Sequence, residues 1–233
     1  AASNYAIATS EGAPAAPGAT LVAGSQDDDT TVPITTLPAD FAFSIYGTPV
    51  TLLRADTNGI LGFNATTGAS SAGNGPLPAG IFSTPSLVAH WDDLDGSTNA
   101  TIGGGVYTAV SGTAPNRIFD IEWRMTRYIP NAVLGPPTIV FTVRLYETSN
   151  LIEIVYTNVV GNIGQNNSAG SNGVSATIGI QAAPNGTQLT QFSFDTASLA
   201  ANRKLSFTRA AGSCQQGPGV CVDPGTIFRD GFE

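Results

Sequence analysis

The densest group of oxygen ligands in the sequence is a short acidic segment. Asp92, Asp93 and Asp95 follow directly after an apolar run. Calcium is held in proteins by about six to eight oxygen atoms, many of them from carboxylates. The loop of an EF-hand does not fit, because Trp91 would fill its first ligand position and Ile102 its last. Two interpretations stay open: a structural turn whose carboxylates accept backbone N–H groups, which the pattern favours, and a calcium site.

Two other groups of potential ligands favour structural roles. The run Asp27-Asp28-Asp29 is expected to be a solvated loop rather than a metal site. Cys214 and Cys221 lie in a Gly- and Pro-rich segment, where a disulfide would close a short loop. A zinc site would need further Cys or His ligands, which this segment lacks. We predict a disulfide, which fits an oxidising compartment, and no cofactor other than the open case of calcium.

Groups suited to nucleophilic or acid–base catalysis are scarce. His90 is the single histidine and lies within the apolar run 87–91, where we expect a buried ring bonded to a neighbour. Catalytic triads need a positioned, accessible imidazole. Asp120 and Glu122 share one face of a predicted strand, as a glycosidase pair would require, but ion pairing with nearby arginines explains them without catalysis. We therefore predict that the protein is not an enzyme.

Composition argues against nucleic-acid binding and against a transmembrane segment. Charged residues make up 11% of the 233 residues, against about a quarter in an average globular protein. The net charge is −8, from 17 acidic and 9 basic residues, and Lys204 is the only lysine. Such a surface cannot easily neutralise phosphates, so nucleic acid is not an expected partner. No apolar run approaches the roughly 18 residues of a transmembrane helix, so no transmembrane segment is expected.

The first residues suggest export from the cell. The chain opens with Ala1-Ala2-Ser3 and has no initiator Met, as expected after a signal peptide is removed. We therefore expect a secreted protein that is extracellular or held at the cell surface.

Apolar residues alternate with polar ones over most of the chain, which is the pattern of β-strands. Hairpins are predicted over 52–63, around Asn58-Gly59, and over 138–159. Residues 118–128 alternate so regularly that one face of this strand should be core and the other solvated. Residues 196–203 are the only predicted helical turn. The sequence therefore predicts an all-β protein, an antiparallel β-sandwich of the jelly-roll kind.

Segments rich in Gly and Pro mark the predicted boundaries between three parts of the chain. Residues 1–36 are predicted as an N-terminal arm with one or two short strands. Residues 37–209 are predicted as the sandwich, and residues 210–233 as a tail that carries the disulfide.

The order of several motifs resembles nidogen-like extracellular domains. They are Phe41 to Gly47 (FAFSIYG), Thr57 to Phe63 (TNGILGF), Val88 to Asp95 (VAHWDDLD) and Phe141 to Tyr146 (FTVRLY), although Thr142 stands where the family usually has Gln. The resemblance covers residues 37–209 and implies an adhesion or interaction module without a catalytic set. The last seven residues, IFRDGFE, are similar to a terminus of secreted proteins in some Gram-negative bacteria, which implies a bacterial source.

These expectations lead to two functional hypotheses. The first is a non-enzymatic structural or adhesive protein that self-associates, or joins other extracellular proteins, into a filament through its ends. A neighbouring copy would receive the strand that contains Tyr5 and Ile7, or the side chains of Phe228 and Phe232. Packing of both ends on their own domain is the competing expectation.

The second hypothesis is a monomeric module that binds a glycan or a protein. Tyr107, Tyr128 or Tyr146 would then provide a ring on which a sugar stacks, beside residues 92–95.

Overall fold

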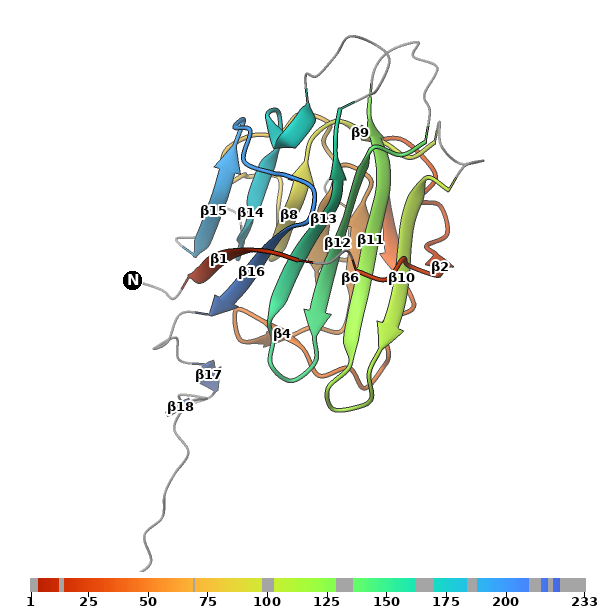
Figure 1. The fold of residues 1–233 in the computed structure, drawn as a ribbon. Helices are drawn as coiled ribbons and strands as arrows, with labels where there is room; N and C mark the ends of the chain where they lie inside the picture. The colour runs from red at the N-terminus through yellow and green to blue at the C-terminus, as the bar shows by residue number, and fades with distance from the viewer. Residues whose placement is uncertain are drawn as a thin grey trace, which may run out of the picture.

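A computed structural model describes residues 4–12, 15–68, 70–97, 103–128, 136–161, 170–183, 188–209, 215–217 and 220–222. Two antiparallel sheets face each other in these residues (Figure 1). The larger sheet has the order β1 (Tyr5–Glu11), β16 (Arg203–Arg209), β13 (Ile152–Val159), β12 (Ile139–Tyr146), β11 (Ile118–Arg127), β10 (Gly105–Ser111) and β2 (Thr20–Leu21), and β9 (Leu94–Asp95) also pairs with β11.

The second sheet and three small elements complete the fold. The sheet has the order β15 (Leu189–Phe194), β14 (Thr177–Gln181), β8 (Ser86–Trp91), β7 (Ile60–Phe63), β6 (Leu53–Asp56) and β3 (Thr31–Ile34). The small elements are the hairpin β4 (Ser44–Ile45) and β5 (Thr48–Pro49), the hairpin β17 (Gln215–Gly217) and β18 (Val220–Val222), and the 3-10 turn η2 (Ser171–Gly173).

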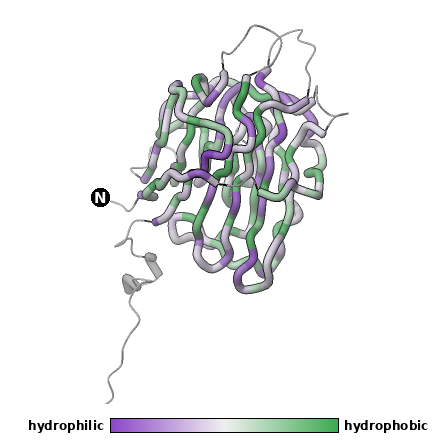
Figure 2. Tube along the Cα trace, in the orientation of Figure 1, coloured by the Kyte–Doolittle hydropathy of each residue, from purple (hydrophilic) through white to green (hydrophobic). Residues whose placement is uncertain are grey.

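The predicted antiparallel sandwich is confirmed. Figure 2 shows hydrophobic and hydrophilic residues alternating along the central strands. On β11 the alternation places Phe119, Ile121, Trp123 and Met125 between the sheets, and none of them has any exposed surface. Burial of such side chains supplies most of the favourable free energy of folding.

Both predicted hairpins are present. β6 and β7 pair from Asp56 opposite Ile60, and β12 and β13 pair along most of their length. Gly59 in the first turn has φ +79°, and a Cβ at this position would lie 2.1 Å from the carbonyl oxygen of His90. Only glycine therefore fits between this turn and strand β8.

The predicted helical turn at residues 196–203 is wrong. Among the described residues, helical geometry is confined to η2. The backbone N–H groups of Ser198 and Leu199 both donate to the carbonyl oxygen of Asn172, each at 3.0 Å. These contacts with a distant segment replace the local bonds that a helical turn requires.

The outer face of β11 is not solvated, contrary to the prediction. Asp120 is 4% exposed and Glu122 is 7% exposed. β1 pairs with β16 at one edge of the sheet and β2 pairs with β10 near the other, so the chain between them crosses the outer face (Figure 1). The Arg144–Asp120 and Arg124–Glu122 ion pairs, at 3.1 and 2.7 Å, confirm the predicted pairing on this face.

The first 36 residues, expected as an arm, supply three strands of the sandwich. β1 and β2 belong to the larger sheet and β3 to the smaller one. The predicted C-terminal sites fall outside the described residues: Cys214, Phe228 and Phe232 are not among them, and only the backbone of Cys221 is described. Within the described residues, no helix has the length and apolar character that a membrane span requires.

Candidate functional site

Two acidic turns meet at one end of the sandwich. Residues 92–95 follow β8, and residues 27–29 precede β3. Asp28 and Asp95 face each other in an isolated antiparallel bridge. The Oδ1 atom of Asp95 accepts hydrogen bonds from the backbone N–H and the hydroxyl of Ser97, at 2.7 and 2.6 Å. The bridge between Asp28 and Asp95 therefore joins two turns that lie far apart in the sequence.

Asp92 forms contacts that stabilise its own turn. Its Oδ1 accepts the backbone N–H of Asp93 at 2.9 Å, and its Oδ2 accepts the hydroxyl of Ser175 at 2.6 Å. The same Oδ2 lies 3.5 Å from Nε of Arg127. Both carboxylate oxygens are therefore engaged within the protein, as the structural-turn interpretation requires.

Asp93 instead joins the other acidic turn. Carboxylate oxygens of Asp28, Asp29 and Asp93 lie within 4.8 Å of one another. Burial raises the pKa of Asp28 to about 6, and repulsion from neighbouring aspartates adds to the shift. Burial and the Asp29 charge also raise the pKa of Asp93. Of the predicted calcium ligands, only Asp93 belongs to this cluster, and calcium binding stays a prediction.

An open hollow of about 500 Å³ lies beside these turns. The strand ends and loops around it contribute Asn74, Asp92, Asp93, Arg127, Ser175 and Asp195. The amide group of Asn74 donates to Asp195 Oδ1 at 2.9 Å and to Thr177 Oγ1 at 3.1 Å, which fixes its orientation. A ligand entering this hollow would therefore meet polar groups that already have defined positions.

Of the three predicted tyrosines, only Tyr128 is an exposed residue. Tyr128 is 37% exposed, and its backbone N–H donates to the carbonyl oxygen of Asp93 at 2.8 Å. The guanidinium of Arg124 covers the ring of Tyr107, 3.8 Å from its centroid. The hydroxyl of Tyr146 donates to Glu153 Oε2. Tyr107 and Tyr146 thus hold parts of the larger sheet together.

His90 is buried in the core, as predicted, and is not part of this site. It has no exposed surface, and its ring stacks on Phe141 with centroids 5.8 Å apart. Phe141 stacks in turn on Trp123. Neither ring nitrogen has a hydrogen-bond partner in the described part of the chain, so the expected bond to a neighbour is not formed. Burial lowers the pKa of His90, which keeps the ring neutral.

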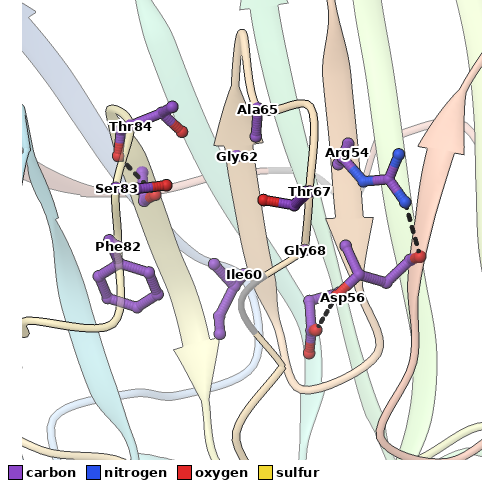
Figure 3. Close-up of a pocket in the computed structure, with 12 residues that line it drawn as sticks. Arg54, Asp56, Ile60, Gly62, Ala65, Thr67, Gly68, Phe82, Ser83 and Thr84 are labelled. Carbon is purple, nitrogen blue, oxygen red and sulfur yellow. Dashed lines mark hydrogen bonds between the residues drawn. The ribbon is translucent and has the colours of Figure 1, made fainter.

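A second pocket lies over strands β6, β7 and β8 (Figure 3). Arg54 and Asp56 stand on one side of it, and Ile60 and Phe82 on the other. Burial raises the pKa of Asp56 to about 6, although hydrogen bonds from Thr31 and the backbone oppose the shift. The interior volume is about 20 Å³, which is room for about one water molecule. This pocket is too small for an organic ligand.

The residues predicted to mediate assembly lie on β1, as far as they are described. Tyr5 is 2% exposed, and its ring meets that of Tyr46 edge-on with centroids 5.1 Å apart. The hydroxyl of Thr190, on β15, donates to the carbonyl oxygen of Tyr5 at 2.7 Å. Ile7 is half-buried. Tyr5 therefore connects the end of the larger sheet with the end of the smaller one.

Sequence reasoning missed the acidic cluster as a unit and the position of residues 15–19 over the outer face. Both depend on pairing between distant strands, which local patterns do not encode. One available signal was the run Asp27-Asp28-Asp29 itself, because three adjacent carboxylates repel one another unless their surroundings compensate.

Comparison with known proteins identifies the family. The model of the family described as "NIDO related" matches residues 4–217, so the chain belongs to this family and carries a nidogen-like domain. The match begins at residue 4, directly before β1, and so includes the three N-terminal strands that belong to the sandwich. No curated protein and no solved structure matches the chain in these comparisons.

Proposed function

We propose that this protein is a non-enzymatic extracellular structural module that associates with other copies of itself by exchanging strand β1. The position of β1 carries the proposal. It is an edge strand of the larger sheet, and it pairs with β16 through seven residue pairs, from Tyr5 opposite Arg209 to Glu11 opposite Arg203.

The side chains of β1 contribute little to the core. Tyr5 is buried and Ile7 is half-buried, while the other five residues are exposed. The attachment therefore depends mainly on backbone hydrogen bonds, which any copy of the strand can form with any copy of β16. Exchange of an identical element between protomers replaces each contact with the same contact, so it costs little free energy.

Two further observations support a protein that works through its surface. The only imidazole of the chain, that of His90, is enclosed in the core and cannot act as a general base. Nidogen-like domains are extracellular, and membership of the family supports secretion. A bacterial source and attachment to the cell surface remain part of the proposal.

Light scattering and negative-stain electron microscopy test the proposal. The full chain is expected to form oligomers or filaments whose fraction rises with protein concentration. A chain that lacks residues 1–12 should lose this behaviour while near-ultraviolet circular dichroism reports an intact core. Equal association of the two chains would exclude strand exchange, and a monomeric full chain at all concentrations would exclude self-association.

A further inference from the structure

The open hollow at the loop end has a mixed polar lining that suits one chemical class of ligand. We infer that it binds a saccharide through the hydroxyl groups of the sugar. This inference is independent of strand exchange, because the hollow lies between the ends of β8, β11, β14 and β15, whereas β1 lies on the far side of β16.

The walls of the hollow are fixed before any ligand arrives. Ser175 and Arg127 both contact the carboxylate of Asp92. A Cβ at Gly170, where φ is +91°, would lie 2.3 Å from Cδ of Arg127, so the absence of a side chain there leaves space for the arginine. Asn74 is held against Asp195. Groups that need not reorder on binding lose less conformational entropy, which favours affinity.

The charges around the hollow exclude several ligand classes. Asp92, Asp93 and Asp195 would repel a phosphate, a sulfate or a carboxylate. The guanidinium of Arg127, whose side chain remains 26% exposed, offsets only one of these negative charges. A lipid chain would remove water from these charged and polar side chains without offering them new hydrogen bonds, which costs free energy. A neutral ligand that both donates and accepts hydrogen bonds satisfies all of them.

Apolar surface next to the polar groups fits the faces of a sugar ring. Val174 lines the hollow and is 39% exposed. An exposed apolar side chain of this kind can lie against the C–H face of a pyranose. Carboxylates would meanwhile accept hydrogen bonds from the sugar hydroxyls.

A glycan array probed with the full chain tests the inference, followed by calorimetry with the soluble oligosaccharides that bind. Chitohexaose, maltohexaose and mannohexaose are included in both steps. Ser175→Ala and Asp195→Asn, which both change the lining of the hollow, are each expected to weaken binding at least tenfold. Asp40→Asn is the matched control, because this 77%-exposed carboxylate pairs with Arg117 at the opposite end of β11 and should not affect binding.

Each alternative result overturns the inference. Absence of binding across the array and to the three oligosaccharides excludes a saccharide site. Binding that survives both substitutions places the sugar elsewhere on the protein. Calcium binding without any saccharide binding would assign the acidic turns to a cation instead. Circular dichroism of each variant separates loss of the site from loss of the fold.

Discussion

The backbone N–H of Gly18 donates to Oε2 of Glu122 at 2.7 Å, although the two residues are 104 positions apart. Arg124 completes the contact, since its guanidinium donates both to the carbonyl oxygen of Gly18, at 2.8 Å, and to Glu122. These bonds hold the segment between β1 and β2 against the outer face of the larger sheet. β1 can reach another copy more easily when this segment is released, so the contact bears on strand exchange.

Substitution of Gly18 should loosen this contact. A Cβ at position 18 would lie 2.6 Å from Cβ of Tyr107 and 3.0 Å from its carbonyl carbon, so the segment must move. We expect Gly18→Ala to lower the free energy of unfolding by about 1–3 kcal/mol, as overpacking typically does. Urea denaturation measures the change.

Gly80→Ala provides the control, because nothing lies within 4 Å of a Cβ at position 80. It should leave the urea midpoint almost unchanged. If Gly18→Ala also had no effect, residues 15–19 would not be held against the sheet as described.

Replacement of His90 should make stability less sensitive to acid. The pKa of His90 in the fold is lowered from 6.5 by burial, so the folded protein resists protonation while the unfolded chain does not. Stability is therefore greatest above pH about 6.5 and is lost as the pH falls below it. His90→Leu removes this dependence. It should also raise the free energy of unfolding at neutral pH by about 1 kcal/mol, because two unpaired nitrogen atoms disappear.

Urea denaturation of both proteins between pH 8 and 5 measures this effect. The difference in stability between variant and wild type should widen as the pH falls. A constant difference over this range would show that His90 is protonated as easily in the fold as in the unfolded chain.

Removal of one charge from the acidic cluster should stabilise the protein at neutral pH. The pKa of Asp28 is raised from 3.8 to about 6, so the folded state favours the protonated form. The fold gains stability as the pH falls from above 6 towards 4, and ionisation removes this gain at higher pH. Asp28→Asn resembles the protonated form at every pH. Its advantage in melting temperature should therefore be largest above pH 6 and should shrink towards pH 4.

Gly80→Ala is again the control, because it changes no ionisable group and should show no such trend. An advantage for Asp28→Asn that did not depend on pH would contradict repulsion within the cluster. Melting with and without calcium, for wild type and Asp93→Asn, tests the sequence-based prediction of a calcium site.

The sandwich could be predicted because local sequence patterns indicate its strands. β11 alternates apolar and polar residues along its length, and the Asn58-Gly59 turn specifies a hairpin. The burial of the opposite face of β11 could not be predicted in this way. Asp120 and Glu122 are charged yet buried, and Glu122 binds Gly18 in the segment before β2; no local pattern indicates which distant segment will do so.

The candidate site was predictable only in part. Residues 92–95 stood out as a concentrated acidic turn, and Tyr128 was named as one of three rings beside it. Their neighbours Asn74, Ser175 and Asp195 come from separate loops, and only the pairing of β8, β14 and β15 brings these loops together. Such pairing depends on the whole fold, so residue spacing does not reveal it.

The most direct test of strand exchange uses two single-cysteine substitutions on separate chains. Ala8 and Ser206 face each other across β1 and β16. The Cβ atoms of such opposite residues lie about 4.5–5.5 Å apart, close enough for a disulfide after a small adjustment. Ala8→Cys and Ser206→Cys chains are mixed, concentrated and oxidised. Mass spectrometry then identifies the products, and each chain oxidised alone gives the background. Strand exchange predicts a heterodimer linked between positions 8 and 206, whereas its absence at every concentration would contradict the account.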